Sequence, residues 1–298
     1  MNAVPPLFAA NPDNASAAYR NIRAADNANT RDGRQHCEDL WNTFAPLADD
    51  HFITEFPIRF HERWFEMYTG VSLLRRGFHV DSANRGPDFR LAVDGRRIWI
   101  ECVCSTAGEE GHPDAVPEQE GAGWVPHDAI ALRLRASLEV KAQKYQRYLD
   151  DGIVNRNDPL IIALNVHAVP LAWLDVEDNM MRAVYGRGNL VVTIDRDTGT
   201  ITGTDYEQIT AIPKVATTTE IGVRPFIDGS MGHVTGIIGS RADACNRPER
   251  LGDDFTFLPN LTAEQPWPGG IIQLGEEWFF EEAEDKWQGR RQSHMRGV

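Results

Sequence analysis

An apolar run at residues 160–166 limits the possible folds of this chain more than any other segment. Its sequence, Leu-Ile-Ile-Ala-Leu-Asn-Val, presents apolar side chains to both faces of a β-strand. Strands of this kind are buried on both faces and are typical of sheets that helices cover on each side. The sequence therefore predicts an α/β fold with this strand in its interior.

The segments before this run predict the rest of a core. Residues 58–76 carry an apolar stripe with helical spacing, and residues 129–150 carry a second one. Between the two helices, three short strands are predicted at residues 78–81, 88–93 and 98–104. The predicted order is therefore helix, three-strand meander, helix, strand.

The chain divides into three parts by these patterns. Residues 1–54 predict a helical lead-in, residues 55–170 contain the predicted core, and residues 171–298 predict an α+β extension packed on that core. A length of 298 residues fits one large domain or a core with one substantial extension. The role of the extension is left open by its sequence.

The composition excludes several classes of protein. With 42% hydrophobic and 25% charged residues, the chain is neither disordered nor fibrous. No apolar run approaches the ~18 residues of a membrane span, and the first residues lack the features of a signal peptide. The four cysteines form no CxxC pair, which argues against structural zinc and a disulfide framework. We therefore expect a soluble, cytoplasmic protein with no membrane partner.

The formal charge of −14 argues against a protein that coats nucleic acid without specificity, because phosphate binding requires a basic surface. However, the charge is unevenly distributed. Residues 51–150 carry 13 Lys and Arg against 15 Asp and Glu, so most of the acidity lies elsewhere, notably in residues 275–285. The middle of the chain therefore remains compatible with nucleic acid, and the acidic C-terminal region is a candidate surface for a protein partner or a homodimer.

Two carboxylates of the predicted meander are candidates for chemistry. Glu101 lies within the apolar strand 98–104, where an unpaired charge would be costly. Asp88 opens the neighbouring strand, so its carboxylate can lie beside that of Glu101. Adjacent carboxylates repel unless a cation lies between them, and Mg²⁺ takes oxygen ligands. The alternatives are an arginine partner for Glu101 and a turn-capping role for Asp88.

The helix predicted at residues 129–150 adds two lysines. Lys141 occupies a position of its buried stripe, and Lys144 lies at the margin of the same face. Because this helix follows strand 98–104 and packs back on the sheet, we expect Lys141 to point toward the carboxylates. The alternative is that its long side chain extends to solvent.

The helix predicted at residues 58–76 contributes one more acidic candidate. Glu62 lies on this helix, away from the main apolar stripe. It could be an additional metal ligand, or equally a surface carboxylate paired with Arg59 or Arg63.

These residues carry a resemblance to a known family. A helix with Glu62, then Gly86-Pro87-Asp88, Ile100-Glu101-Cys102-Val103 and a lysine-bearing helix is similar to the PD-(D/E)XK, or restriction-endonuclease-like, nuclease superfamily. The resemblance covers roughly residues 55–168 and implies a restriction-endonuclease-like α/β core. It also implies metal binding by Asp88 and Glu101, together with the Cys102 carbonyl and Glu62.

The resemblance implies a Mg²⁺-dependent endonuclease, with Mn²⁺ as a substitute, that hydrolyses phosphodiester bonds, with DNA as the expected partner. In this family a lysine two residues after the glutamate positions or activates the attacking water, but position 103 is Val. Some members of the family supply this lysine from the following helix. Lys141 fits such a relocated lysine, and Lys144 is the second choice. The alternative is a catalytically inactive nuclease-fold protein that serves as a binding or assembly module.

Overall fold

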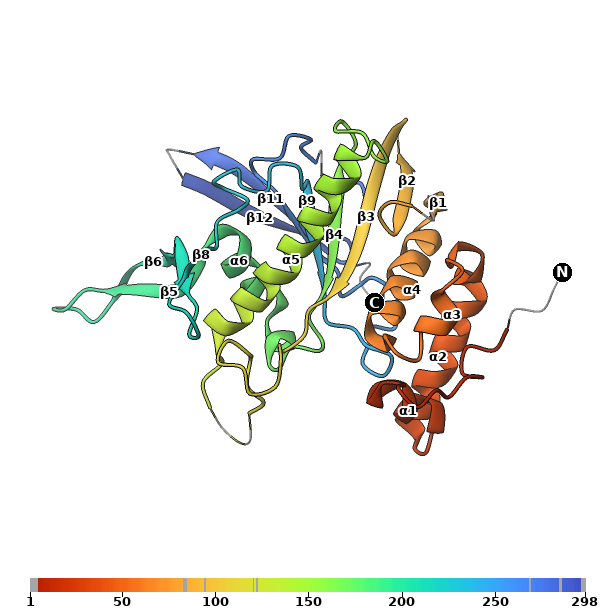
Figure 1. Ribbon diagram of the computed structural model, residues 1–298. Coiled ribbons are helices and arrows are strands. Elements are labelled where there is room, and N and C mark those ends of the chain that lie inside the picture. Colours follow the sequence, from red (N-terminus) through yellow and green to blue (C-terminus); the bar gives the residue numbers. More distant parts are fainter. Residues whose placement is uncertain are drawn as a thin grey trace.

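The computed structural model describes residues 5–82, 85–93, 95–119, 121, 123–267, 269–283 and 286–295. One mixed sheet of eight strands runs through the molecule, in the order β1-β2-β3-β4-β9-β10-β11-β12 (Figure 1). Its strands are β1 (Val80–Asp81), β2 (Phe89–Val93), β3 (Arg96–Cys104), β4 (Leu160–Asn165), β9 (Gly236–Ser240), β10 (Thr256–Pro259), β11 (Glu276–Ala283) and β12 (Lys286–Ser293). The predicted α/β class is confirmed.

Helices cover both faces of this sheet. The helices are α1 (Ala17–Ala24), α2 (Ala28–Phe44), α3 (Phe52–Glu55), α4 (Phe60–Arg76), α5 (His127–Asp150) and α6 (Val176–Tyr185), with the short 3₁₀ helices η1 (Ala45–Leu47) and η2 (Ala172–Leu174). Helices α1–α4 gather on one face, while α5 and α6 pack on the other (Figure 1). In the described part of the chain, no helix is both long enough and apolar enough to cross a bilayer.

The centre of the sheet explains the apolar run of the sequence. Every residue of β4 is buried, and its side chains alternate between the two hydrophobic clusters on the two faces. Strand β4 pairs in parallel with β3 on one side and with β9 on the other. The strand predicted to be interior is therefore the middle of a three-strand parallel block.

The elements around this block follow the predicted order of helix, meander, helix, strand. Helix α4 comes first, the antiparallel strands β1, β2 and β3 follow, and α5 leads to β4. The first predicted strand is shorter than expected, because only Val80 and Asp81 pair with β2. Residues 105–126, between β3 and α5, contain no helix or strand in the part of this stretch that the structure describes.

The second half of the chain, expected as an α+β extension packed on the core, contributes strands to the core sheet itself. Strands β9 to β12 continue the core sheet beyond β4, so the sheet crosses the expected boundary at residue 170. The acidic region ends in the β11–β12 hairpin, and its residues Glu284 and Asp285 lie outside the described residues. Strand β9 joins the sheet because it covers the open edge of β4. Ile162 of β4 pairs with Ile237 of β9, and both residues are fully buried.

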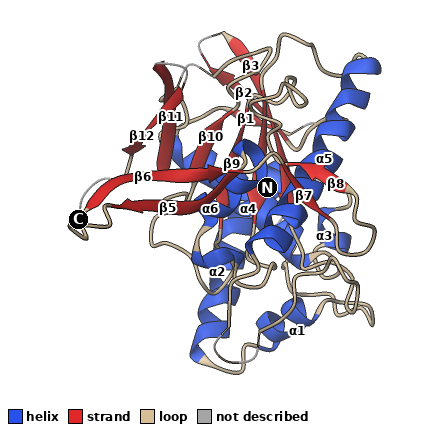
Figure 2. Ribbon diagram, turned by 90° about the vertical axis from the view of Figure 1, so that its left-hand side faces the viewer, coloured by secondary structure: helices blue, strands red, loops and turns tan. Residues whose placement is uncertain are grey.

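Two small hairpins lie outside the main sheet. Strands β5 (Arg187–Ile194) and β6 (Ile201–Gln208) form a ribbon that projects from the body (Figures 1 and 2). Strands β7 (Ala211–Pro213) and β8 (Glu220–Gly222) form a shorter one. Most side chains of this ribbon are exposed.

The shared sheet leads to a stability prediction for two matched isoleucines. Ile237→Ala is expected to cost about 2–5 kcal/mol of unfolding free energy, because it leaves a cavity beside β4. Ile201→Ala, on the ribbon where Ile201 is 66% exposed, is expected to change the unfolding free energy by less than about 0.5 kcal/mol. Urea unfolding followed by circular dichroism measures both. Equal small losses, or a separate transition for the second half, would contradict a single shared core.

Candidate active site

Glu101 is a carboxylate buried inside the sheet. Strand alternation directs its side chain to the face that α5 covers, and only 2% of that side chain is exposed. Lys141 Nζ lies 2.6 Å from its Oε1, and Lys144 Nζ lies 2.7 Å from the same atom. The two lysines are three residues apart on α5 and therefore share one helix face. The predicted orientation of Lys141 toward Glu101 is confirmed, and Lys144 accompanies it.

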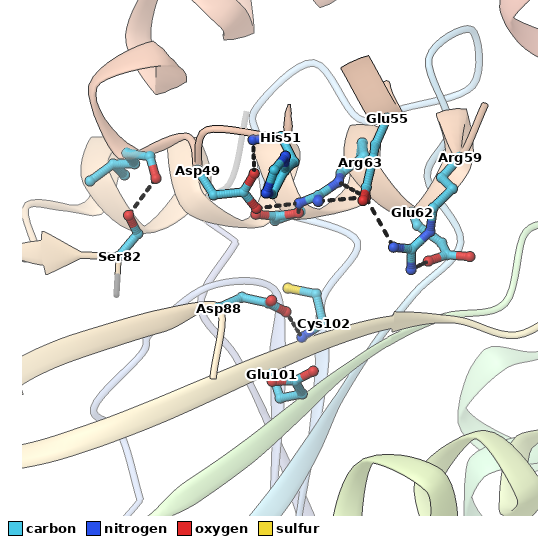
Figure 3. A network of polar contacts seen from close by, with 12 residues as sticks. Asp49, His51, Glu55, Arg59, Glu62, Arg63, Ser82, Asp88, Glu101 and Cys102 are labelled. Atoms are coloured by element: carbon cyan, nitrogen blue, oxygen red, sulfur yellow. Dashed lines mark hydrogen bonds and ion pairs between the residues drawn. The ribbon is translucent and has the colours of Figure 1, made fainter. Parts of the chain in front are cut away.

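Asp88 lies next to Glu101, at the start of the neighbouring strand. Its Oδ2 accepts the backbone N–H of Cys102 at 2.7 Å, which holds the carboxylate against β3 (Figure 3). Burial, and then the negative charge of Glu101, raise the pKa of Asp88 to about 6. The positive charges of Lys141 and Lys144 act in the opposite direction. Asp88 and Glu101 thus interact electrostatically, as their predicted positions on adjacent strands require.

Glu66 is a third carboxylate of this site, and it is not among the residues predicted from the sequence. It lies on α4, with 13% of its side chain exposed, and accepts a hydrogen bond from Arg63 Nη1 at 2.8 Å. Burial, and then the charge of Asp88, raise its pKa to about 8. The sequence contains one indication of its role, because Glu66 lies four residues after Glu62 and therefore one helical turn further along the same face.

Glu62 itself lies at the rim of the site. Its side chain is 44% exposed and forms an ion pair with Arg59, which is one of the two arrangements expected from the sequence (Figure 3). The carboxylate of α4 that is buried and interacts with Asp88 is therefore that of Glu66. Metal binding by Glu62 stays a prediction.

Arg63 connects the site to the N-terminal helices. Its guanidinium bonds Glu55 Oε2 at 2.6 Å, Asp49 Oδ2 at 3.0 Å and Glu66, and only 12% of its side chain is exposed (Figure 3). A buried guanidinium with three carboxylate partners has little freedom to turn. Arg63 therefore fixes Glu66 and forms one wall of the site.

A cavity of about 260 Å³ lies between α4, the meander and α5, and Asp88, Glu66 and the two lysines that bond Glu101 line it. Its polar lining comes from five segments of the chain and includes both signs of charge. The charged residues that line it are Asp49, Arg59, Glu62, Arg63, Glu66, Asp88, Lys141 and Lys144. A cavity with this lining suits a small polar or ionic group rather than an apolar ligand.

Cys102 contributes its backbone to this site. Its thiol lies on the α4 face of the sheet, in the core cluster opposite Glu101. Burial raises the pKa of that thiol well above its usual value, so the sulfur stays protonated and is a poor nucleophile. Its N–H is bound to Asp88, and the role expected for its carbonyl stays a prediction.

One atom of the site lacks a partner. Glu101 Oε2 is buried and accepts no hydrogen bond from the residues that the structure describes. An unsatisfied buried carboxylate oxygen is costly, and a hard cation is one group that can satisfy it. Among the described residues, no group of three or more His, Cys, Asp or Glu side chains is arranged to hold a metal. The pair Asp88 and Glu101 still fits Mg²⁺, which commonly takes one or two carboxylates, water and phosphate oxygens.

In comparisons with known proteins, no family model, no curated protein and no solved structure matches this chain.

The electrostatics of Asp88 lead to a prediction about pH. Its folded-state pKa of about 6 exceeds the ordinary value of 3.8. Between pH 3.8 and about pH 6, Asp88 is deprotonated in the unfolded chain but keeps its proton in the folded protein. Asp88 therefore lowers the free energy of unfolding as the pH rises through this window. Asp88→Asn is expected to remove this loss, about 1–3 kcal/mol, because the amide stays neutral and can still accept the Cys102 N–H.

Urea unfolding from about pH 4 to about pH 7 measures this effect. The matched control is Asp50→Asn, at an exposed aspartate, which is expected to keep the wild-type pH dependence. An Asp88→Asn variant whose stability declines as steeply as that of the wild type would show that Asp88 is not the strained carboxylate.

Proposed function

We propose that this protein is a metal-dependent nuclease that hydrolyses phosphodiester bonds, with DNA as the substrate. The observation that carries this proposal is the buried Glu101, which has two lysines on one oxygen, a free second oxygen and Asp88 beside it. This arrangement combines oxygen donors for a cation with positive charges for a phosphate. The choice of DNA rests on the resemblance to PD-(D/E)XK nucleases.

Asp88 and Glu101 would hold the divalent cation in this proposal. When bound, Mg²⁺ would polarise the scissile phosphate and favour ionisation of water. Glu66 would support the pair from α4, with its orientation set by Arg63. These carboxylates come from the residue before β2, from β3 and from α4, so their spacing depends on how these segments pack.

The two lysines would act on the phosphate or on the attacking water as fixed positive charges. Burial lowers the pKa of Lys141, but the charges of Glu101 and Asp88 outweigh burial and raise it above its usual value. The same balance, with Glu101 as the main partner, raises the pKa of Lys144. Both ammonium groups are therefore protonated at neutral pH and can donate hydrogen bonds, but they cannot act as general bases.

Position 103 is Val in this chain, where the family pattern has a lysine, and the two lysines of α5 offer a replacement. A lysine at that position would share the face of Glu101, because side chains two residues apart on a strand point the same way. In this chain α5 covers that face and brings Lys141 and Lys144 to the same carboxylate. Their contact with Glu101 supports a relocated lysine.

The second candidate is a catalytically inactive module with the same core. It is favoured by the ion pairs themselves, because two lysines on Glu101 compensate its charge without a metal. The described residues also contain no cluster of three metal-ligating side chains. A module of this kind would bind or assemble through other surfaces and would leave phosphodiester bonds intact.

Cleavage of supercoiled plasmid with Mg²⁺, Mn²⁺ or EDTA tests the first proposal. We expect nicking by the wild type with either metal and none with EDTA. Glu101→Gln and Asp88→Asn are each expected to lower the rate by about 100-fold or more while the fold survives. Glu139→Gln, on the solvent side of α5, is the matched control and should cleave like the wild type.

Two outcomes of this assay would contradict the proposal in different ways. Full activity in Glu101→Gln or Asp88→Asn, with Glu139→Gln also active, would remove the site assignment. No metal-dependent cleavage of plasmid, single-stranded DNA or RNA by a folded wild type would favour the inactive module.

The shared contact of the lysines predicts a non-additive effect on cleavage. Each lysine bonds the same Glu101 oxygen, so either one alone still leaves one positive charge in the site. We expect Lys141→Met and Lys144→Met each to lower the rate by about tenfold, and the double variant to abolish cleavage. Lys214→Met, at an exposed lysine, is the control. Wild-type rates in the double variant would show that the lysines only compensate charge.

A further inference from the structure

The β5–β6 ribbon keeps an apolar surface exposed to solvent. It projects away from the body of the molecule in two perpendicular views (Figures 1 and 2). Its aliphatic residues are between 41% and 66% exposed, and they are Leu190, Val191, Val192, Ile194 and Ile201. Aliphatic side chains that gather on a surface in this way commonly mark an interaction site. The ribbon is therefore a candidate contact surface.

Strand β5 has an open edge on this ribbon. One edge of β5 pairs with β6, and the other pairs with no strand in the described part of the chain. Residues 190–193 pair continuously with residues 203–206, and the two register shifts of the ribbon lie on either side of this stretch. An open edge presents backbone N–H and C=O groups to which a further strand can bond. Residues 190–193 therefore form a template for strand pairing.

This edge differs from the other strand edges of the molecule. Residues 188–194, Gly-Asn-Leu-Val-Val-Thr-Ile, include no charged residue and no proline. At the two ends of the main sheet, by contrast, β1 has only two residues and the sequence of β12 contains Lys286, Arg290 and Arg291. Short strands and charged side chains are common protections of an exposed edge. The open edge of β5 is thus suited to a partner strand.

A further strand would also stabilise the ribbon. A two-stranded hairpin by itself is only marginally stable in water, whereas three or more strands support one another. Leu190 and Val192 point to one face of the ribbon and Val191 points to the other, because side chains alternate along a strand. A strand added at this edge would therefore meet aliphatic side chains on both faces.

The charges of the ribbon favour the β5 strand of a second copy as this partner. In an antiparallel pair related by a two-fold axis, residues 190–193 of each copy face residues of the same uncharged run. Pairing through β6 would instead place an acidic strand, with Asp205 and Glu207, beside its copy. Like charges opposite one another destabilise a strand pair. Because the whole chain has a formal charge of −14, the uncharged run is a favourable place for two copies to meet.

We propose that two copies of this chain associate through an antiparallel pair of β5 strands at residues 190–193. The two ribbons then form one four-strand sheet, with the β5 strands as its inner pair. Contact is confined to the ribbons, so the dissociation constant is micromolar rather than nanomolar. The contact uses none of the residues assigned to hydrolysis, so it goes beyond the proposed nuclease function and does not depend on it.

Sedimentation velocity of the full chain, from about 1 µM to about 100 µM, tests this contact. We expect the wild type to convert from monomer to dimer across this range. Val191→Lys and Val192→Lys are each expected to weaken dimerisation by about tenfold or more, because the two-fold axis brings each new lysine close to its own copy. Circular dichroism checks that both variants fold.

The matched control is Val140→Lys, at a valine of α5 that is 61% exposed. It adds the same charge outside the ribbon and is expected to dimerise like the wild type. Val191→Asp is expected to be monomeric by itself, as Val191→Lys is. An equimolar mixture of these two variants is expected to restore the dimer, because opposite charges then meet across the axis. Mixing would not restore a ribbon that had simply lost its structure.

Amide hydrogen exchange of the wild type locates the contact. We expect the amides of residues 190–193 to exchange more slowly at high than at low protein concentration. The amides of residues 201–208 are expected to change less, because β6 lies on the outer side of the proposed sheet.

Two results would overturn the proposal. One is a folded wild type that stays monomeric throughout the concentration range. The other is a dimer that Val191→Lys and Val192→Lys weaken no more than Val140→Lys does, because such a dimer forms through another surface.

Discussion

The buried carboxylate of Glu101 is the constraint on which the arrangement around it depends. Placing a charge in the middle of a sheet is costly unless other charges and donors compensate it. Here compensation comes from Lys141 and Lys144, which bond one of its oxygens from α5. This contact acts together with the buried apolar residues of α5, such as Leu134 and Leu138, which pack the same helix on the sheet. Removing both lysines would leave an unpaired buried charge, which is far more destabilising than an exposed one.

The chain surrounds this carboxylate with elements from both faces of the sheet. Helix α4 packs on one face and brings Glu66 and Arg63 toward Asp88, whereas α5 brings the lysines to the other face. Asp88 connects the two sides, because it bonds the backbone of β3 and interacts electrostatically with both Glu101 and Glu66. The result is a small cavity in which burial, and then the repulsion between carboxylates, raises the pKa values of Asp88 and Glu66.

Part of this site could be predicted from local patterns. The alternation of a strand placed Glu101 among apolar residues, and the helical period placed Lys141 in a buried stripe, so their contact followed from packing a helix on its preceding strand. Glu66 was not predicted, since its burial and its interaction with Asp88 arise only when α4 packs against the meander. The pairing of His167 with Asp243 was missed for the same reason: these residues are far apart in sequence, and only the parallel alignment of β4 and β9 brings them together.

The sequence by itself determined the α/β class, the interior position of residues 160–166 and the order of the elements around the site, because periodicity and apolar runs act over neighbouring residues. Tertiary structure decided which strands join the sheet. The later strands β9 to β12 extend the core sheet, since the edge of β4 that faces away from β3 is covered only by a strand distant in sequence. It also decided which carboxylates meet, because charges separated along the chain interact only once packing has set their distances and removed water between them.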